Sequence, residues 1–168
     1  MILAPYLANT LLQRPLQTVH VWDIAAKTWF TQATTAERGL YPPDFANIYC
    51  SVVASAEDNS SHNIYILGRN VGGGGIWVFI LTLPAFRWVP VYLSAEYHGS
   101  ESKCLKIYEK HMVVYRGKDW DGCDYDHAMR FQGMGIYDMS SLTWTTEVRL
   151  KDQKYLVPEV LHAIIGGK

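Results

Sequence analysis

The chain has 168 residues, of which 49% are apolar and 13% aromatic, and its 15 basic and 16 acidic side chains leave a net charge of −1. Because no basic block interleaved with aromatic residues is present, we expect no nucleic-acid partner. The longest strongly apolar run, residues 76–83, is far shorter than the ~20 residues that cross a bilayer, and residues 1–12 lack the basic start and the cleavage site of a signal peptide.

Taken in chain order, the predicted elements are short strands separated by turn residues. Two lie within residues 18–32, four follow at 48–55, 63–67, 76–83 and 87–93, and four more at 103–108, 111–115, 135–139 and 143–148. β-Branched and aromatic residues fill these runs, while Gly, Pro, Asn and Ser lie between them. This pattern is typical of an all-β protein.

Three other segments differ from the strands. The glycine-rich residues 71–75 lie between two predicted strands, which favours a connector over a phosphate site, and residues 118–130 form a long polar loop. Near the C-terminus, Pro158 and Glu159 mark a helix start, and Leu161, Ile164 and Ile165 share one face at helical spacing. The alternative, in which residues 164–167 form a further strand, lacks a preceding first strand and polar turn.

One pattern recurs three times: an aliphatic residue, a gap, then Asp or Thr, with Trp six residues later. The copies are Val21, Asp23 and Trp29; Ile80, Thr82 and Trp88; and Ile136, Asp138 and Trp144, so that successive Trp residues lie 59 and 56 positions apart. Repetition at roughly fifty residues indicates an array of small all-β units, and in a propeller each unit is a four-stranded blade.

Each residue type in the pattern has a structural use. We expect the Trp to cover the wide rim of a sheet and to be buried in all three copies, and the Asp or Thr to accept backbone N–H groups of the next turn. Glycines after the second strand, such as Gly68, are expected to bend the chain at positive φ. None of these roles is chemical.

These residues resemble the kelch-repeat propellers. The runs HNIYILGR at 62–69, IWVFILTLPAFRWVPVY at 76–92 and CDYDHAMRFQGMGIYDMSSLTW at 123–144 carry the resemblance, which covers residues 11–167 and is closest to the surface-associated kelch proteins of filamentous fungi, with the galactose oxidase central-domain fold. The family's Gly-Gly pair is reduced to Gly68-Arg69 and Arg116-Gly117. The positions that match the motif are Asp23, Trp29, Gly68, Thr82, Trp88, Gly117, Tyr137, Asp138 and Trp144.

The resemblance implies a fold, a function and a location. The expected fold is a partial propeller of about two and a half blades, with a lead-in at 1–17, a half blade at 18–32, blades at 46–93 and 101–148 within 18–150, and a tail with a short helix at 151–168. Because a closed ring needs at least four blades, or about 200 residues, the sequence is expected to be a fragment, a truncated gene product or one part of a longer protein. The implied function is non-catalytic protein recognition at the cell surface or in a secreted protein.

The alternative is a galactose oxidase-like copper enzyme, which needs a Tyr cross-linked to Cys, two His and a second Tyr as ligands. No local motif supports it, and no cofactor or metal is expected. The acidic group Asp119, Asp121, Cys123, Asp124, Asp126 and His127 lacks the glycine and the final glutamate of a calcium loop, so it is interpreted as a solvated loop.

Three further expectations concern modification and stability. Cys50 and Cys104 are expected as free thiols in matching first strands, because stacked sheets lie ~10 Å apart, while a disulfide from Cys123 to either one stays open. Asn59-Ser60-Ser61 is a sequon for N-glycosylation in an exposed turn. An open arc is expected to expose apolar residues at its ends and to self-associate or stay partly molten; these residues are Val19, Val21, Ile24, Ile136 and Met139.

Overall fold

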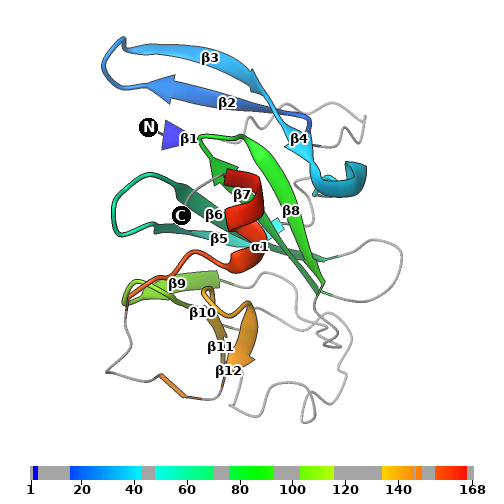
Figure 1. Cartoon of the computed structure of the whole chain (residues 1–168), viewed down its shortest axis with the longest axis vertical. Coiled ribbons are helices and arrows are strands. Elements are labelled where there is room, and N and C mark those ends of the chain that lie inside the picture. The colour runs from blue at the N-terminus through cyan, green and yellow to red at the C-terminus, as the bar shows by residue number, and fades with distance from the viewer. Residues whose placement is uncertain are drawn as a thin grey trace.

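The computed structural model describes residues 2–3, 16–42, 48–69, 76–92, 103–115, 134–145, 147–148 and 154–165. These residues form three sheets and, at the C-terminal end, one short α-helix. The sheets lie one above another as layers in chain order (Figure 1). The predicted all-β class is confirmed, and the stacked layers are consistent with an arc of a propeller.

The first sheet has the order β1-β2-β3, with β1 at Ile2–Leu3, β2 at Thr18–Asp23 and β3 at Thr28–Ala33. The antiparallel hairpin β2–β3 corresponds to the two strands predicted within residues 18–32. Strand β1 was not predicted; it pairs antiparallel with β2, with Ile2 opposite Trp22. The first sheet therefore has a third strand on the side of β2 away from β3.

The middle sheet is an antiparallel run of β5 (Ile48–Ser55), β6 (His62–Arg69), β7 (Ile76–Leu83) and β8 (Arg87–Tyr92). A short strand that the sequence did not predict, β4 (Thr35–Ala36), extends the sheet by pairing parallel to β8. A single 3-10 turn, Glu37–Gly39, follows β4, and its Glu37 forms an ion pair with Arg87 on β8. The link between the first and middle sheets thus becomes part of the middle sheet.

The last sheet has the order β12-β11-β10-β9 and is antiparallel throughout. Its strands are β9 (Lys103–Ile107), β10 (His111–Tyr115), β11 (Met134–Asp138) and β12 (Thr143–Thr145). All four were predicted to within a few residues. The sheet has the strand order expected for one four-stranded unit.

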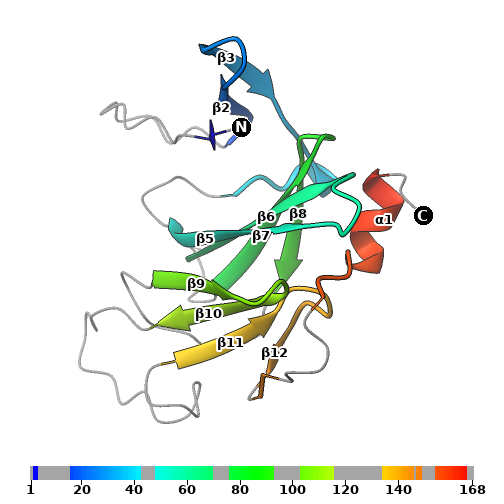
Figure 2. The same cartoon turned by 90° about the vertical axis from the view of Figure 1, so that its left-hand side faces the viewer.

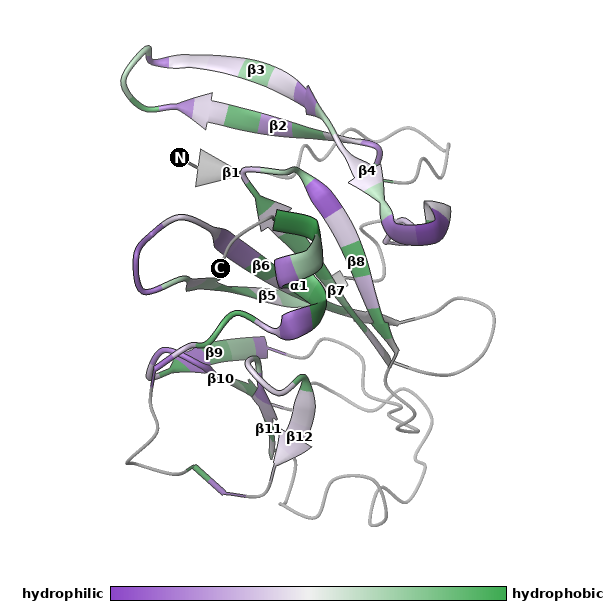
Figure 3. Cartoon of the chain, in the orientation of Figure 1, coloured by the Kyte–Doolittle hydropathy of each residue, from purple (hydrophilic) through white to green (hydrophobic). Residues whose placement is uncertain are grey.

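Apolar residues fill both spaces between the sheets, because alternate residues of a strand point to opposite faces. The larger core lies between the middle and last sheets and contains Val52, Ala54, Tyr65, Leu67, Val78, Ile80, Val89, Met112, Val114, Tyr137 and Met139. The smaller core lies against the first sheet and contains Leu16, Phe79, Leu81, Leu83 and Trp88, with Val19 packed on it. The middle sheet is therefore covered on both faces, and its β7 is apolar along most of its length (Figure 3).

Helix α1 spans Glu159–Ile165 and confirms the helix predicted near the C-terminus. It begins after Pro158, whose carbonyl accepts the N–H groups of Leu161 and His162. Leu161 is fully buried in the larger core, so the helix covers the end of the space between the middle and last sheets. Figure 2 shows α1 at the side of the stack, beside the middle sheet.

The expectation for Gly68 was wrong. Gly68 is buried inside β6 and pairs with Ile48 on one side and Trp77 on the other. Two neighbouring strands hold this residue extended, so the strand continues to Arg69. Among the described residues, the glycine with positive φ is Gly39, at 71°.

Candidate interaction site

The three copies of the sequence pattern form three hairpins of the same geometry. In each, the aromatic or aliphatic residue before the Asp or Thr lies opposite the Trp: Trp22 and Trp29, Leu81 and Trp88, Tyr137 and Trp144. The fourth residue after the Asp or Thr has a positive φ in every copy, namely 52° at Lys27, 51° at Phe86 and 57° at Leu142. The sequence repeat is therefore also a repeat of backbone conformation.

The turn of each hairpin depends on the residue at the Asp or Thr position. Asp23 Oδ1 accepts the N–H groups of Ala25 and Ala26 at 2.9 and 3.1 Å, and Asp138 Oδ1 accepts those of Ser140 and Ser141 at 2.9 and 3.2 Å. Thr82 does not act in this way, and its buried hydroxyl has no hydrogen-bond partner among the described residues.

The expectation of a capping role for Thr82 was therefore wrong, and its neighbour explains why. The residue two positions on is Pro84, which has no N–H to donate. The β7–β8 turn keeps the repeated backbone conformation without the side-chain hydrogen bond.

The expected burial of all three Trp residues was wrong for Trp29. Trp88 is 1% exposed and donates its Nε1–H to the carbonyl of Leu16 at 2.9 Å, and Trp144 is half-buried against the larger core. Trp29 is 51% exposed. Among the described residues, the aromatic ring that it contacts is that of Trp22, with the two ring centroids 5.2 Å apart.

A common orientation explains this difference. Trp88 belongs to the core shared with the first sheet, and Trp144 packs on the core shared with the middle sheet, so each points toward the preceding sheet. Trp29 lies opposite Trp22 in the β2–β3 hairpin. Side chains alternate between the two faces of a strand, so Trp22 lies on the opposite face of β2 from Val19 and Val21. Val19 packs toward the middle sheet. Trp29 therefore points to the opposite face, where the described residues include no preceding sheet.

The expectation of free thiols was also wrong, because Cys50 and Cys104 form a disulfide with their Cα atoms 5.5 Å apart. Cys50 lies on β5 and Cys104 on β9, which are edge strands of the middle and last sheets. The spacing of about 10 Å applies to the faces of packed sheets, whereas these two edges approach more closely. The disulfide consequently fastens two neighbouring sheets to each other.

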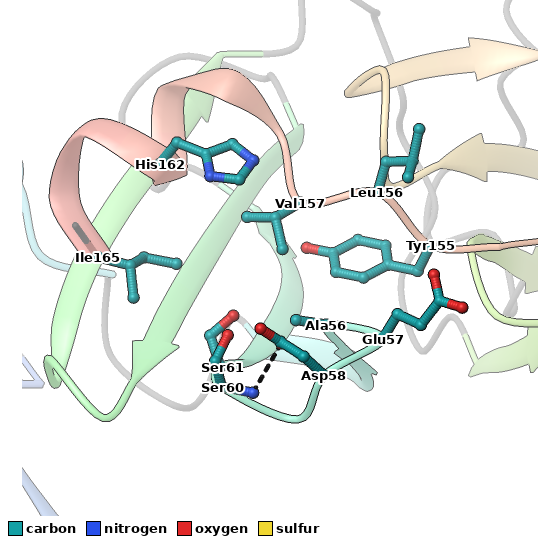
Figure 4. Close-up of a pocket in the computed structure, with 10 residues that line it drawn as sticks. All are labelled: Ala56, Glu57, Asp58, Ser60, Ser61, Tyr155, Leu156, Val157, His162 and Ile165. Atoms are coloured by element: carbon teal, nitrogen blue, oxygen red, sulfur yellow. Dashed lines mark hydrogen bonds between the residues drawn. The ribbon is translucent and has the colours of Figure 1, made fainter. Parts of the chain in front are cut away.

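A cleft of about 440 Å³ opens between the β5–β6 turn and the C-terminal segment (Figure 4). The turn lines one side and the segment with α1 lines the other, through Ala56, Glu57, Asp58, Ser60 and Ser61 and through Tyr155, Leu156, Val157, His162 and Ile165. Leu156 is 68% exposed. The cleft thus combines an acidic turn with an apolar opposite side.

The charge of the cleft lies on its turn side. The hydroxyl and the backbone N–H of Ser60 both hydrogen-bond to Asp58 and hold the pKa of this carboxyl below its usual value. Glu57 forms an ion pair with Lys154, the residue before Tyr155, at 2.5 Å. Since both of these side chains are largely exposed, the pair contributes little to stability. Asp58 is therefore a fixed negative charge at neutral pH.

Tyr155, which lines the cleft, belongs to a buried hydrogen-bond network. The Tyr155 hydroxyl lies 2.9 Å from the Tyr65 hydroxyl and accepts the Asn63 Nδ2–H at 3.0 Å, while Tyr65 donates to the Met139 carbonyl at 2.8 Å. Burial raises the pKa of Tyr65 and Tyr155, so both phenols stay protonated. This network joins the C-terminal segment to the middle and last sheets. It was not predicted, because in the sequence Tyr155 is only one aromatic residue ahead of the helix.

A second polar group lies at the β9–β10 turn. Asp138 accepts a hydrogen bond from Lys110 Nζ at 3.1 Å, and His111 Nε2 lies 3.8 Å from the same carboxylate. Burial would raise the pKa of Asp138, but Lys110 and the two backbone N–H groups of its turn outweigh burial and lower it. Burial lowers the pKa of His111, against the opposing effect of Asp138. The group anchors the turn of the last hairpin.

Several predicted positions lie outside the described residues: Gly117, Cys123 and the acidic group from Asp119 to His127. Among the described residues, no three His, Cys, Asp or Glu side chains lie close enough to hold a metal ion. Cys50 and Cys104 use their sulfur atoms in the disulfide, so neither carries the Tyr cross-link of a galactose oxidase-like site.

The sequon residue Asn59 is exposed in the turn between β5 and β6, beside the cleft. Its φ is 56°, and its N–H donates to the Ala56 carbonyl at 2.9 Å. The side chain therefore stands on a tight, ordered turn.

The expected exposure of apolar residues at the ends of the arc holds for only some of them. Ile24 is 57% exposed, and Val19 and Ile136 are half-buried. Val21 and Met139 are buried, which corrects the expectation for these two. Met139 belongs to the larger core together with Tyr155 and Leu161, so the C-terminal segment contributes to covering it.

Comparison with known proteins supports the kelch assignment of the fold. The chain is similar to a "Kelch repeat-containing protein" of Arthroderma benhamiae, with 25% identity over 186 aligned residues that cover 90% of this chain and 26% of the relative. The chain thus spans about a quarter of the length of this relative. The stacked antiparallel sheets fit a kelch-type fold.

No family model matches the chain. Within the described residues, the structure contains no helix with the length and apolar character that a membrane span requires.

Proposed function

We propose that this chain is a non-catalytic kelch-repeat interaction module that binds another protein as part of a larger surface-associated or secreted propeller. The observation that carries the proposal is the repeated hairpin, with the same register and the same positive φ in three stacked sheets, together with the similarity to a kelch-repeat protein over 90% of the chain. Such a stack is a rigid scaffold whose turns are free to vary for recognition.

We place the contact with the partner at the cleft between the β5–β6 turn and α1. Its sides come from two segments about a hundred residues apart, and the network of Tyr65, Asn63 and Tyr155 holds them together. Exposed Leu156 offers an apolar contact, and Asp58 offers a fixed negative charge. A peptide segment with an apolar residue next to a basic one fits this pair.

The disulfide supports the proposed location. Disulfides persist in oxidising compartments and are rare in the cytosol. The Cys50–Cys104 bond and the exposed sequon at Asn59 both suit passage through a secretory pathway.

The test uses the purified chain, chemically cross-linked to proteins of the surface and culture fluid of the producing cells. A double variant, Asp58→Ala with Leu156→Ala, should reduce capture of a specific partner at least about tenfold, because central interface residues dominate binding energy. Ile24→Ala, which changes an exposed apolar residue far from the cleft, is the control and should capture as the wild type does.

Capture of the partner by the double variant at the wild-type level would remove the cleft from the proposal.

Copper analysis and an oxidase assay on the same preparation test the proposal that the module is non-catalytic, and bound copper with turnover would overturn it. Glycosidase treatment of secreted protein tests the location: the mobility shift should disappear in Asn59→Gln and persist in Ser60→Ala, which keeps the sequon.

A further inference from the structure

The sequon residue Asn59 stands on one wall of the cleft. It lies between Asp58 and Ser60 in the chain, and both of these neighbours line the cleft from the β5–β6 turn. Because Asn59 is exposed, its side chain can carry a glycan that extends into solvent without disturbing either core. A glycan at this position therefore begins one residue away from two groups that border the cleft.

Hydrogen bonds within the turn fix the place where the glycan begins. The N–H of Ala56 donates to the carbonyl of Ser61 at 3.0 Å, and the N–H of Asn59 donates to the carbonyl of Ala56 at 2.9 Å. The N–H of Ser60 donates to Oδ1 of Asp58 at 2.9 Å. The φ of Asn59, 56°, is one that Asn adopts more readily than most residues. The first sugar thus has a defined origin, while the sugars beyond it move through the space around the turn.

The opposite side of the cleft lies close to this space. The C-terminal segment faces the turn and carries Leu156, which is 68% exposed (Figure 4). Lys154, two residues before Leu156, forms an ion pair with Glu57 on the turn, so the two sides touch beside the cleft. A bulky, hydrated sugar chain that starts on the turn consequently occupies part of the volume through which a partner must approach.

Two kinds of partner would meet this sugar chain differently. The surface of a folded domain has to displace most of it to reach Leu156, whereas an extended peptide is narrow enough to pass beside it. We propose that a glycan on Asn59 acts as a size filter, which admits an extended peptide segment to the cleft and excludes the surface of a folded domain. The inference rests on the proposed function and adds to it the form of the partner, a flexible tail or loop.

The filter works by excluded volume and requires no contact between the sugars and the partner. Its strength therefore depends on how many sugars follow the first one. Trimming the glycan to the first sugar leaves the polypeptide unchanged and frees most of the volume, so it should open the cleft to a folded domain.

The test measures how fast a thiol in the cleft reacts, so it does not require the natural partner. The reporter is Leu156→Cys combined with Cys123→Ser, which removes the cysteine outside the Cys50–Cys104 disulfide. The protein is secreted from a glycosylating host and compared before and after an endoglycosidase trims the glycan to its first sugar.

Two probes carry the same maleimide group, one at the end of a flexible Gly-Ser peptide and one fixed on the surface of ubiquitin, a small folded domain. The peptide probe should react at the same rate before and after trimming. The ubiquitin probe should react several-fold more slowly while the glycan is intact and should recover after trimming. The reporter with Asn59→Gln should react with both probes as the trimmed protein does.

The matched control is Ile24→Cys with Cys123→Ser, which places the thiol at a residue of similar exposure, 57% against 68%, in the β2–β3 turn. Trimming should change neither of its rates. If the glycan is present and trimming leaves the ubiquitin rate at Leu156→Cys unchanged, or if it slows both probes equally, the filter is wrong and binding at the cleft still stands. A secreted chain without a glycan on Asn59 overturns the filter and the proposed location together.

Discussion

The first hairpin, β2–β3, and the two later hairpins, β7–β8 and β11–β12, have the same pattern but different surroundings. In all three, the Trp lies opposite the residue before the Asp or Thr, and the fourth turn residue has positive φ. Trp88 is nevertheless 1% exposed and Trp29 51% exposed. The hairpin determines where its Trp points, and the preceding sheet determines whether that Trp is buried.

The largest difference between the hairpins should appear when the Trp is removed. Trp88→Ala should lower the free energy of unfolding by about 3–5 kcal/mol, because it leaves a cavity and removes the hydrogen bond to Leu16. Trp29→Ala should cost less than about 1 kcal/mol in the monomer. Denaturant unfolding, at a concentration where sedimentation shows a monomer, measures both. Similar losses would mean that the surroundings do not separate the two hairpins.

The disulfide should stabilise only one side of the middle sheet. Replacing Cys50 and Cys104 together by Ala should cost about 2–4 kcal/mol, because the bond closes a loop of 54 residues. Amide hydrogen exchange should become faster in β9 and β10 and change little in β2 and β3. Equal loss of protection in the first sheet would contradict a local role.

The next largest difference should be in how much the Asp residues of the first and last hairpins contribute to the free energy of unfolding. Asp138→Asn should lower the free energy of unfolding by about 1–2 kcal/mol, because Asp138 also binds Lys110 and its side chain is only 15% exposed, whereas Asp23→Asn should lower it by about 0.5–1 kcal/mol. The comparison is made by urea unfolding at pH 7.

The wild type and Asp138→Asn should also differ in how their free energy of unfolding depends on pH. The pKa of Asp138 is lower in the folded state, so its contribution is complete above the unfolded value of about 4 and is lost as the pH falls through the folded value. On acidification from about pH 5 to about pH 2, the free energy of unfolding of Asp138→Asn should consequently fall less than that of the wild type, because the variant has no carboxylate to protonate at this position. An unchanged acid slope would contradict the lowered pKa.

The smallest effect should come from the residue with positive φ. Lys27→Gly should raise the free energy of unfolding by up to about 1 kcal/mol, because Lys27 is exposed and Gly adopts this conformation without a steric cost. Leu142→Gly relieves the same backbone but removes a side chain packed on the larger core, so it should be destabilising. Thermal melts of the two variants measure opposite shifts, and shifts of the same sign would contradict the comparison.

The strands of the sheets were predictable because each depends on a local alternation that the sequence displays. Strands of eight residues such as β5 and β7 were found at their predicted bounds. The two-residue strands β1 and β4 were missed, because so short a segment has no period and pairs only through distant partners.

The candidate site was far less predictable. The cleft joins the turn around Asp58 to Leu156 and α1, and no local pattern links two segments so far apart in the chain. The disulfide was mispredicted because the distance between sheet faces was applied to edge strands, and the exposure of Trp29 because burial was inferred from the repeat alone. Contacts between units, unlike the units themselves, leave little trace in one sequence.

The bond between Cys50 and Cys104 has a consequence for resistance to proteolysis. It spans the whole of β6, β7 and β8, so a protease that cuts the backbone once anywhere between these two cysteines leaves two pieces that remain covalently joined. Such a nicked chain would migrate as one band on a gel without reductant and as two bands with it. The module would therefore tolerate cleavage in this stretch without shedding either part.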